Sequence, residues 1–324
     1  MDFKDKIISE LTIILDKEKQ SGNSFKIRAY QKVLPELKNL EAIHNLQDIE
    51  GIQGIGKGIK DRIKEIIETG ELQSAEKIKN DPKIKIIEDF MKIYGVGPVK
   101  ANELYETNGM KSIEQIKTEG EKYLNEKQKI GLKHYEDLKE RIPRSEMKIH
   151  EKVIKKFVAR INPNLIATIV GSYRRENPDS GDIDVLISYK EGFKDVEEAF
   201  KNIIKLMKES NYIIDILATG SKKCLAISSL NEVEKGKKKY TVVRRLDLLL
   251  TKPEEYPYAL LYFTGSDKFN IEMRKKALQL GYSLNEHTLK FLNSNKNKNK
   301  IPDMETEEDV FKFLDMSYLE PNKR

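Results

Sequence analysis

The sequence of 324 residues contains no tryptophan and a single cysteine, Cys224. One cysteine excludes an internal disulfide, and a single cysteine with four scattered histidines argues against a zinc site. No apolar run approaches the length of a membrane span, and the N-terminus lacks the hydrophobic core of a signal peptide. We therefore expect an intracellular protein that makes no contact with a membrane.

Neither sign of charge dominates the sequence. Lysine and arginine total 59 and aspartate and glutamate 53, which gives a formal net charge of +6. This modest excess permits a polyanionic partner such as nucleic acid. Solvated helix faces rich in lysine and glutamate account for it equally well, so charge alone leaves both interpretations open.

Hydrophobic periodicity divides the chain into a helical first half and a mixed second half. Apolar residues recur at helical spacing in 3–20 and in 59–70, where Gly70 is expected to cap a helix. From Leu165 onward, short strands surround one amphipathic helix at 196–210. Two polar connections are expected at 232–240 and 293–300. The pattern predicts an α+β protein with an all-helical N-terminal part that extends to about Glu140.

Two segments repeat one pattern, IQGIGKGIKDRI (52–63) and IYGVGPVKANEL (93–104). Each has an apolar residue, Gly-x-Gly and then a helix. The first segment follows a Walker A loop as far as Lys57, but Gly58 replaces the required Ser or Thr and no strand precedes it. One such turn is usually structural, whereas two copies favour helix-hairpin-helix motifs that hold DNA phosphates through backbone N–H groups.

The two turns supply candidate binding groups of two kinds. The DNA-binding candidates are Gly54, Gly56, Lys57 and Lys60 in the first turn and Gly95 and Gly97 in the second. Backbone carbonyls that could hold a monovalent cation, Na⁺ or K⁺, belong to Glu50, Ile52, Ile55, Met91, Ile93 and Val96.

A second pattern places acids on strands. In GSYRRENPDSGDIDVLI (171–187), Asp182 and Asp184 share one face of a strand while the intervening apolar residues face the core. RRLDLLL (244–250) has the same alternation, with Arg245 and Asp247 on one face and leucines on the other. If these strands are neighbours, three carboxylates converge and require positive charge between them. Divalent cations with oxygen ligands, Mg²⁺ first, fit this requirement.

Residues just before the acids suit phosphate. Gly171 and Ser172 are expected to end a strand and to offer a backbone N–H and a hydroxyl. Arg175 adds a guanidinium that can bind phosphate through two N–H groups, and Ser180–Gly181 adds another backbone N–H. Aspartate pairs on strands are often surface ladders. The ordered combination of Gly-Ser, Asp-x-Asp and a later strand aspartate instead indicates a triphosphate bound with Mg²⁺.

These motifs resemble family X of the DNA polymerases, of the beta type. The resemblance covers nearly the whole chain in the family's order. It rests on both glycine hairpins and on GLKHYEDLKERIPRSEM (131–147), the segments 171–187 and 244–250, ALLYFTGSDKFNIEMRKKAL (259–278) and GYSLNEHTL (281–289). The family's fold is a lyase-like helical domain and a helix-hairpin-helix subdomain, followed by a nucleotidyltransferase palm with a mixed β-sheet and a small α+β subdomain. The implied divisions are 1–80, 81–140, 141–253 and 254–324.

The resemblance assigns roles to individual residues. Asp182, Asp184 and Asp247 would hold two Mg²⁺ ions, for which Mn²⁺ can substitute, and Arg245 would orient Asp247. The triphosphate would lie against Gly171, Ser172, Arg175, Ser180, Gly181 and Arg141. The sugar and base would lie against Tyr262, Phe263, Gly265, Asp267 and Asn270. DNA would be contacted by Lys26, Tyr30 and Arg274.

The implied activity is gap filling in DNA repair by a monomer that uses dNTPs on gapped or nicked duplex DNA, with DNA ligase or other repair proteins as partners. The location would be the nucleus of a cell or, for a viral member, the virion or a cytoplasmic replication site. Two alternatives stay open. One is a template-independent nucleotidyltransferase, and the other is a non-catalytic scaffold that binds DNA ends.

The sequence departs from the family at the deoxyribose-phosphate lyase. That reaction needs a lysine amine, and Arg62 occupies its position. Gly58 and Ser74 replace basic residues of the 5′-phosphate pocket. Lys26 and Tyr30 are retained, and Lys57 and Lys60 lie nearby in sequence. We expect a domain that grips DNA and has weak or absent lyase activity.

Overall fold

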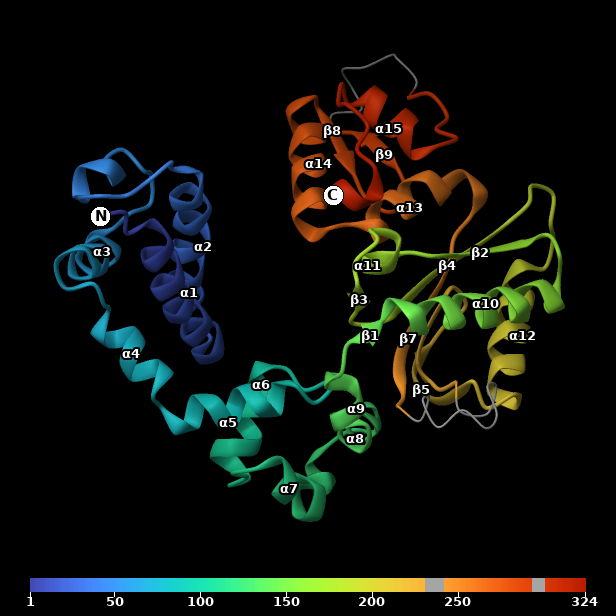
Figure 1. Ribbon diagram of the computed structural model, residues 1–324, viewed down its shortest axis with the longest axis horizontal. Helices are drawn as coiled ribbons and strands as arrows, with labels where there is room; N and C mark the ends of the chain where they lie inside the picture. Colours follow the sequence, from blue (N-terminus) through green and yellow to red (C-terminus); the bar gives the residue numbers. More distant parts are fainter. Residues whose placement is uncertain (231–241, 293–300) are drawn as a thin grey trace. The chain divides into compact units, whose positions relative to one another are not determined.

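The computed structural model describes residues 1–230, 242–292 and 301–324 (Figure 1). The two connections predicted at 232–240 and 293–300 therefore lie outside the described residues. The chain separates into two units, Met1–Lys133 and His134–Arg324. Within the described ranges, no helix combines the length and hydrophobicity needed to cross a membrane.

The first unit is built from helices, as predicted. Its α-helices are α1 (Lys4–Ser21), α2 (Ser24–Asn39), α3 (Lys57–Thr69), α4 (Gln73–Lys79), α5 (Pro82–Met91), α6 (Pro98–Asn102), α7 (Ile113–Gln115) and α8 (Glu126–Lys133). The apolar stripe of α1, including Ile7 and Leu11, packs with Val33 and Leu37 of α2 in a buried core. The predicted end of α3 is confirmed, since Gly70 adopts a left-handed φ of 80° directly after Thr69.

The two glycine turns have the same backbone conformation. Gly54 and Gly95 adopt φ values of 105° and 86°, which only glycine adopts readily. Gly56 and Gly97 are the N-caps of α3 and α6 and have extended backbone. The repeat in the sequence is therefore also a repeat in conformation, and each turn leads directly into the N-terminus of a helix.

The second unit contains a mixed sheet with helices. Its α-helices are α9 (Tyr135–Lys139), α10 (Arg144–Ile161), α11 (Gly171–Arg174), α12 (Val196–Glu209), α13 (Tyr256–Thr264), α14 (Asp267–Gln279) and α15 (Glu307–Phe313). Its strands are β1 (Ile142–Pro143), β2 (Leu165–Ile169), β3 (Asp179–Ser180), β4 (Ile183–Tyr189), β5 (Ile213–Thr219), β6 (Lys223–Ser228), β7 (Arg244–Leu250), β8 (Tyr282–Leu284) and β9 (Leu289–Phe291).

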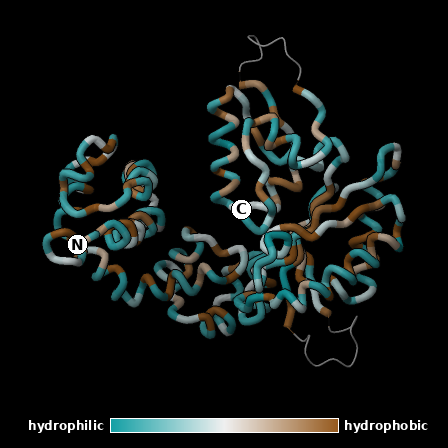
Figure 2. The backbone as a smooth tube through the Cα atoms, turned by 45° about the horizontal axis from the view of Figure 1, so that its top comes forward, coloured by the Kyte–Doolittle hydropathy of each residue, from teal (hydrophilic) through white to brown (hydrophobic). Residues whose placement is uncertain are grey.

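In the described part of this unit, the main sheet has the order β2-β4-β7-β6-β5. The β4–β7 pair is parallel and the other pairs are antiparallel, so the sheet is mixed and the predicted α+β class is confirmed. Figure 2 shows hydrophobic residues along the strands and an alternation of hydrophobic and hydrophilic residues along the helices.

The two faces of the sheet are covered differently. On one face, Ile183 and Val185 of β4 and Leu246 of β7 are fully buried in a core that also contains side chains of α10 and α12. On the other face, Leu186 of β4 packs with Ala259 of α13 in a smaller cluster. Strand alternation places the acids of β4 and β7 on this second, less covered face.

The C-terminal part of the second unit has a core of its own. Phe269 and Met273 of α14 are buried with Phe311 of α15 and Leu289 of β9. An ion network fastens this part to α11, because Glu307 accepts hydrogen bonds from both Arg174 and Arg324 at 2.7 to 2.9 Å.

One local expectation was wrong. Gly171 and Ser172 were expected to end a strand, but β2 ends at Ile169 and Gly171 begins the short helix α11. Gly171 adopts φ 59°, and a side chain there would collide with the carboxylate of Asp184. The left-handed turn explains why the strand cannot continue.

Candidate active site

Three acids from two distant segments meet at the neighbouring strands β4 and β7 in the interior of the main sheet. Asp184 of β4 lies directly beside Asp247 of β7 in the parallel register, and Asp182 precedes β4. One carboxylate oxygen from each residue lies within 4.8 Å of the others. The structure thus brings together the three acids that the two strand motifs single out.

The three carboxylates are electrostatically unfavourable without a cation. Burial, and then the charges of Asp182 and Asp247, raise the pKa of Asp184 to about 7. Burial also raises the pKa of Asp247, with Asp182 adding to the effect while Arg245 opposes it. Asp247 Oδ1 is buried, and the described residues give it no hydrogen-bond partner. A cluster of hard oxygen ligands with one orphaned atom fits divalent cations.

Arg245 supplies positive charge to this cluster. Its Nη2 donates to Asp182 Oδ2 at 2.5 Å and lies 3.3 Å from Asp247 Oδ2. Arg245 therefore contacts the acid that it was expected to orient, and it bridges that acid to Asp182.

The other side of β7 is anchored by a buried ion pair. Arg244 is 4% exposed and donates from Nε and Nη2 to the two carboxylate oxygens of Glu146 on α10, at 2.7 and 2.9 Å. Burial raises the pKa of Glu146, but hydrogen bonds from His150 and Arg244 outweigh it and lower the pKa to about 2. Two consecutive arginines thus hold β7 from opposite faces.

A cavity of about 600 Å³ adjoins the acids and collects most of the predicted nucleotide-binding residues. The predicted residues that line it are Arg141, Gly171, Ser172, Arg175, Gly181, Asp182, Asp184, Tyr262, Phe263, Gly265, Asp267 and Asn270. Ser180 does not line it. Its side chain is buried, and its hydroxyl has no hydrogen-bond partner among the described residues. Arg175 turns towards α13, where its Nη1 donates to the carbonyl oxygen of Thr264 at 2.6 Å.

Sequence reasoning missed three lining residues, Asn177, Ser266 and Lys268. Ser266 could have been found, because a serine directly before a helical pattern is a typical N-cap, and its hydroxyl accepts from Phe269 N. Lys268 is a basic residue inside the YFTGSDKFN motif. No sequence pattern singled out Asn177 as a binding residue.

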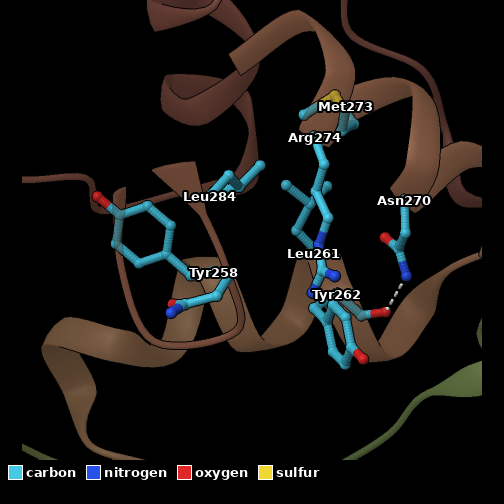
Figure 3. A pocket seen from close by; sticks show the side chains of 8 residues that line it. Tyr258, Leu261, Tyr262, Asn270, Met273, Arg274 and Leu284 are labelled. Carbon is cyan, nitrogen blue, oxygen red and sulfur yellow. Dashed lines mark hydrogen bonds between the residues drawn. The ribbon is translucent and has the colours of Figure 1, made fainter. Parts of the chain in front are cut away.

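Two of the residues expected at the sugar and base, Tyr262 and Asn270, are shown in Figure 3 together with Arg274. Asn270 donates from Nδ2 to the carbonyl oxygen of Tyr262 at 2.8 Å. The guanidinium of Arg274 lies over the ring of Tyr262, 5.0 Å from its centroid. Arg274 lines the smaller pocket of Figure 3, beside the main cavity's residues Tyr262 and Asn270.

The predicted DNA-binding residues of the first unit belong to α2, α3 and the glycine turns. Lys26 is paired with Glu18 at 2.9 Å, and Tyr30 is buried, which raises its pKa. Lys57 and Lys60 are exposed at the start of α3. Arg62 donates from Nη1 to the carbonyl oxygen of Gly58 at 3.2 Å.

The predicted monovalent cation sites lie in the segments that precede α3 and α6, where Met91 is the last residue of α5. Their carbonyls belong to Glu50, Ile52, Ile55, Met91, Ile93 and Val96. Inside these segments, Ile52 O accepts from Ile55 N at 3.5 Å and Ile93 O accepts from Val96 N at 2.9 Å. A carbonyl oxygen has two lone pairs, so one that accepts a hydrogen bond can still bind a cation. These contacts therefore do not decide whether a cation binds, and the cation sites stay a prediction.

Comparison with known proteins gives consistent matches along the chain. Four family models match in succession, described as a helix-hairpin-helix domain (4–72), the fingers domain of DNA polymerase lambda (88–139), the DNA polymerase beta palm (141–253) and the DNA polymerase beta thumb (259–324).

Similar curated proteins carry related names. DNA polymerase lambda of Rattus norvegicus is 31% identical over 330 residues, which cover 98% of this chain and 56% of the relative. DNA polymerase lambda of Arabidopsis thaliana is 29% identical over 306 residues (91% and 57%), and the DNA nucleotidylexotransferase of Xenopus laevis is 29% identical over 308 residues (86% and 60%). The chain thus spans less than two thirds of the length of each relative. These matches agree with the motifs and with the fold, and the chain belongs to family X of the DNA polymerases.

Proposed function

We propose that this chain is a DNA-templated DNA polymerase that fills short gaps during repair by adding nucleotides from dNTPs to a primer 3′-hydroxyl. The observation that carries the proposal is the meeting of Asp182, Asp184 and Asp247 within 4.8 Å, next to a cavity lined by Ser172 and Arg175. This arrangement places metal-binding acids beside groups that bind phosphate.

The three acids are the proposed ligands of two Mg²⁺ ions, for which Mn²⁺ can substitute. Divalent ions, when bound, would neutralise the triphosphate and stabilise the attacking and leaving oxygens. Asp182 and Asp184 would supply carboxylate oxygens towards the triphosphate. Asp247 would lie next to the primer 3′-hydroxyl and favour its deprotonation, while Arg245 keeps Asp247 oriented through its contact at 3.3 Å.

The walls of the cavity would hold the nucleotide in a defined orientation. Ser172 and Arg175 would bind phosphate oxygens, and Arg175 would exchange its bond to Thr264 for one to phosphate. The carbonyl oxygen of Tyr262 is fixed by Asn270, so it could disfavour a ribose 2′-hydroxyl. Asp267 and Asn270 would lie against the base.

The partner of the first unit would be gapped or nicked duplex DNA. The N-terminal ends of α3 and α6 present backbone N–H groups after each glycine turn, which suits DNA phosphates. Na⁺ or K⁺ at the turn carbonyls would support this contact. We propose that the protein acts as a monomer inside the cell, alongside DNA ligase or other repair proteins. The same proposal includes the division of the chain into four parts, 1–80, 81–140, 141–253 and 254–324.

Template dependence tests the proposal against template-independent addition, which the similarity to a DNA nucleotidylexotransferase favours. Primer extension with Mg²⁺ should require a template strand and should insert the complementary base. Equal addition to a single-stranded primer would replace the proposal with the template-independent alternative. Binding of DNA without any addition would favour the scaffold alternative.

The lyase activity should be weak or absent. Arg62 stays protonated and cannot form a Schiff base with the sugar aldehyde. Borohydride trapping on an incised abasic duplex should therefore give little covalent adduct with the wild type, and Arg62→Lys should increase it. Efficient trapping by the wild type would refute this prediction, and the labelled residue would show whether Lys26, Lys57 or Lys60 is responsible.

A further inference from the structure

Arg141, which lines the proposed nucleotide cavity, forms an ion pair with Asp179. Arg141 donates from Nε and Nη2 to one oxygen of Asp179, Oδ1, at 2.9 and 2.7 Å. The two side chains are 57% and 45% exposed. An ion pair with this exposure contributes little to stability, so stability does not explain its geometry.

The backbone places Arg141 in the wall of the cavity, beside Gly181. Strands β1 and β3 pair Ile142 with Ser180, and continuing this antiparallel register sets Arg141 opposite Gly181. Arg141 Nη1, which is not bonded to Asp179, lies 3.0 Å from the position that a Cβ atom on Gly181 would take. Arg141 and Gly181 line the cavity together with Arg175.

We propose that Asp179 competes with the triphosphate for Arg141 and thereby sets the affinity for the incoming nucleotide. This inference rests on the proposed function. A guanidinium binds phosphate oxygens through the same fork of N–H donors that it offers to a carboxylate. Nε and Nη2 are occupied by Asp179. A bound triphosphate must therefore take these donors from Asp179 or use Nη1 alone.

The competition has a direction that can be measured. Without the carboxylate of Asp179, Arg141 offers all of its donors to the triphosphate, and the negative charge of Asp179 no longer opposes binding. Asp179→Asn should therefore bind nucleotide more tightly, about two- to fivefold, which corresponds to the strength of an exposed ion pair. The gain should disappear when Arg141 is absent, because the effect of Asp179 acts through Arg141.

The experiment measures the Kd of a deoxythymidine triphosphate with an α,β-imido bridge, in Mg²⁺, on a gapped duplex with template adenine. The proteins are the wild type, Asp179→Asn, Arg141→Gln, the double variant and Glu176→Gln. Glu176 is the matched control, since it is an exposed acid of the segment that leads into β3 and contacts Asn322 rather than Arg141. Thermal unfolding checks that every variant is folded.

Tighter binding by Asp179→Asn alone, with no further gain in the Arg141→Gln background, supports the inference. Unchanged or weaker binding by Asp179→Asn overturns it. An equal gain in the Arg141→Gln background, or from Glu176→Gln, overturns it as well, because the effect would then be one of general charge. Failure of the wild type to bind the analogue would overturn the proposed function and this inference together.

Discussion

Asp184 shows at the residue scale how a functional requirement opposes stability. Its carboxylate is largely buried beside two other acids, and burial with these charges raises its pKa to about 7. A folded-state pKa above the ordinary value of 3.8 means that the folded protein prefers the protonated form. Without a cation, the stability that this preference supplies is present at low pH and is lost as the pH rises towards and through 7.

Asp184→Asn should therefore stabilise the protein in EDTA at pH 8, by on the order of 2–4 kcal/mol. The advantage over the wild type should shrink as the pH falls from 7 towards 4, since the wild-type carboxylate then takes up its proton. Thermal unfolding at several pH values measures both effects. Added Mg²⁺ should raise the Tm of the wild type more than that of the variant. A variant that is less stable than the wild type at pH 8 would contradict this explanation.

Strand β7 illustrates at the element scale how alternation separates structure from chemistry. Arg244 faces inward to Glu146, whereas Arg245 and Asp247 face the site. The alternation of RRLDLLL predicted which residues share a face, because side chains of a strand point alternately to its two sides. The partner of Arg244 was not predictable, since α10 and β7 are far apart in sequence and only tertiary packing joins them.

Glu146→Ala should destabilise the fold by about 3–5 kcal/mol, because it leaves the guanidinium of Arg244 buried without its partner. The matched control is Glu209→Ala, which removes an exposed pair with Lys205 at 3.9 Å and should cost less than about 1 kcal/mol. Urea unfolding at pH 7 compares the two variants. Equal losses would show that the buried pair does not anchor β7.

At the scale of the whole molecule, the sequence was most informative where function and local geometry coincide. The glycine turns, the two acidic strands and the α+β class all follow from local patterns, and the structure contains them. The orientation of Arg175 towards Thr264 and the pairing of Arg141 with Asp179 did not follow. Both depend on elements that the fold brings together from distant parts of the chain.

The helix at Gly171 shows a further limit of local patterns. Apolar residues up to Val170 predict a strand, but the close approach of Asp184 requires a left-handed turn at the next residue. That approach is a tertiary contact. The same contact places Gly171 and Ser172, the proposed phosphate-binding residues, directly beside the acids. The prediction was therefore wrong about the local backbone conformation but right that these residues lie next to the acids.

The central claim is that acids from β4 and β7 together perform nucleotide transfer, and one measurement tests it most directly. Single-turnover addition of the complementary nucleotide to a one-nucleotide gap in Mg²⁺ should fall by at least about a hundredfold in Asp247→Ala. Binding of the gapped duplex, measured in the same samples, should stay close to that of the wild type, and the exposed control Glu198→Ala should change neither quantity. Addition by Asp247→Ala at the wild-type rate would contradict the account.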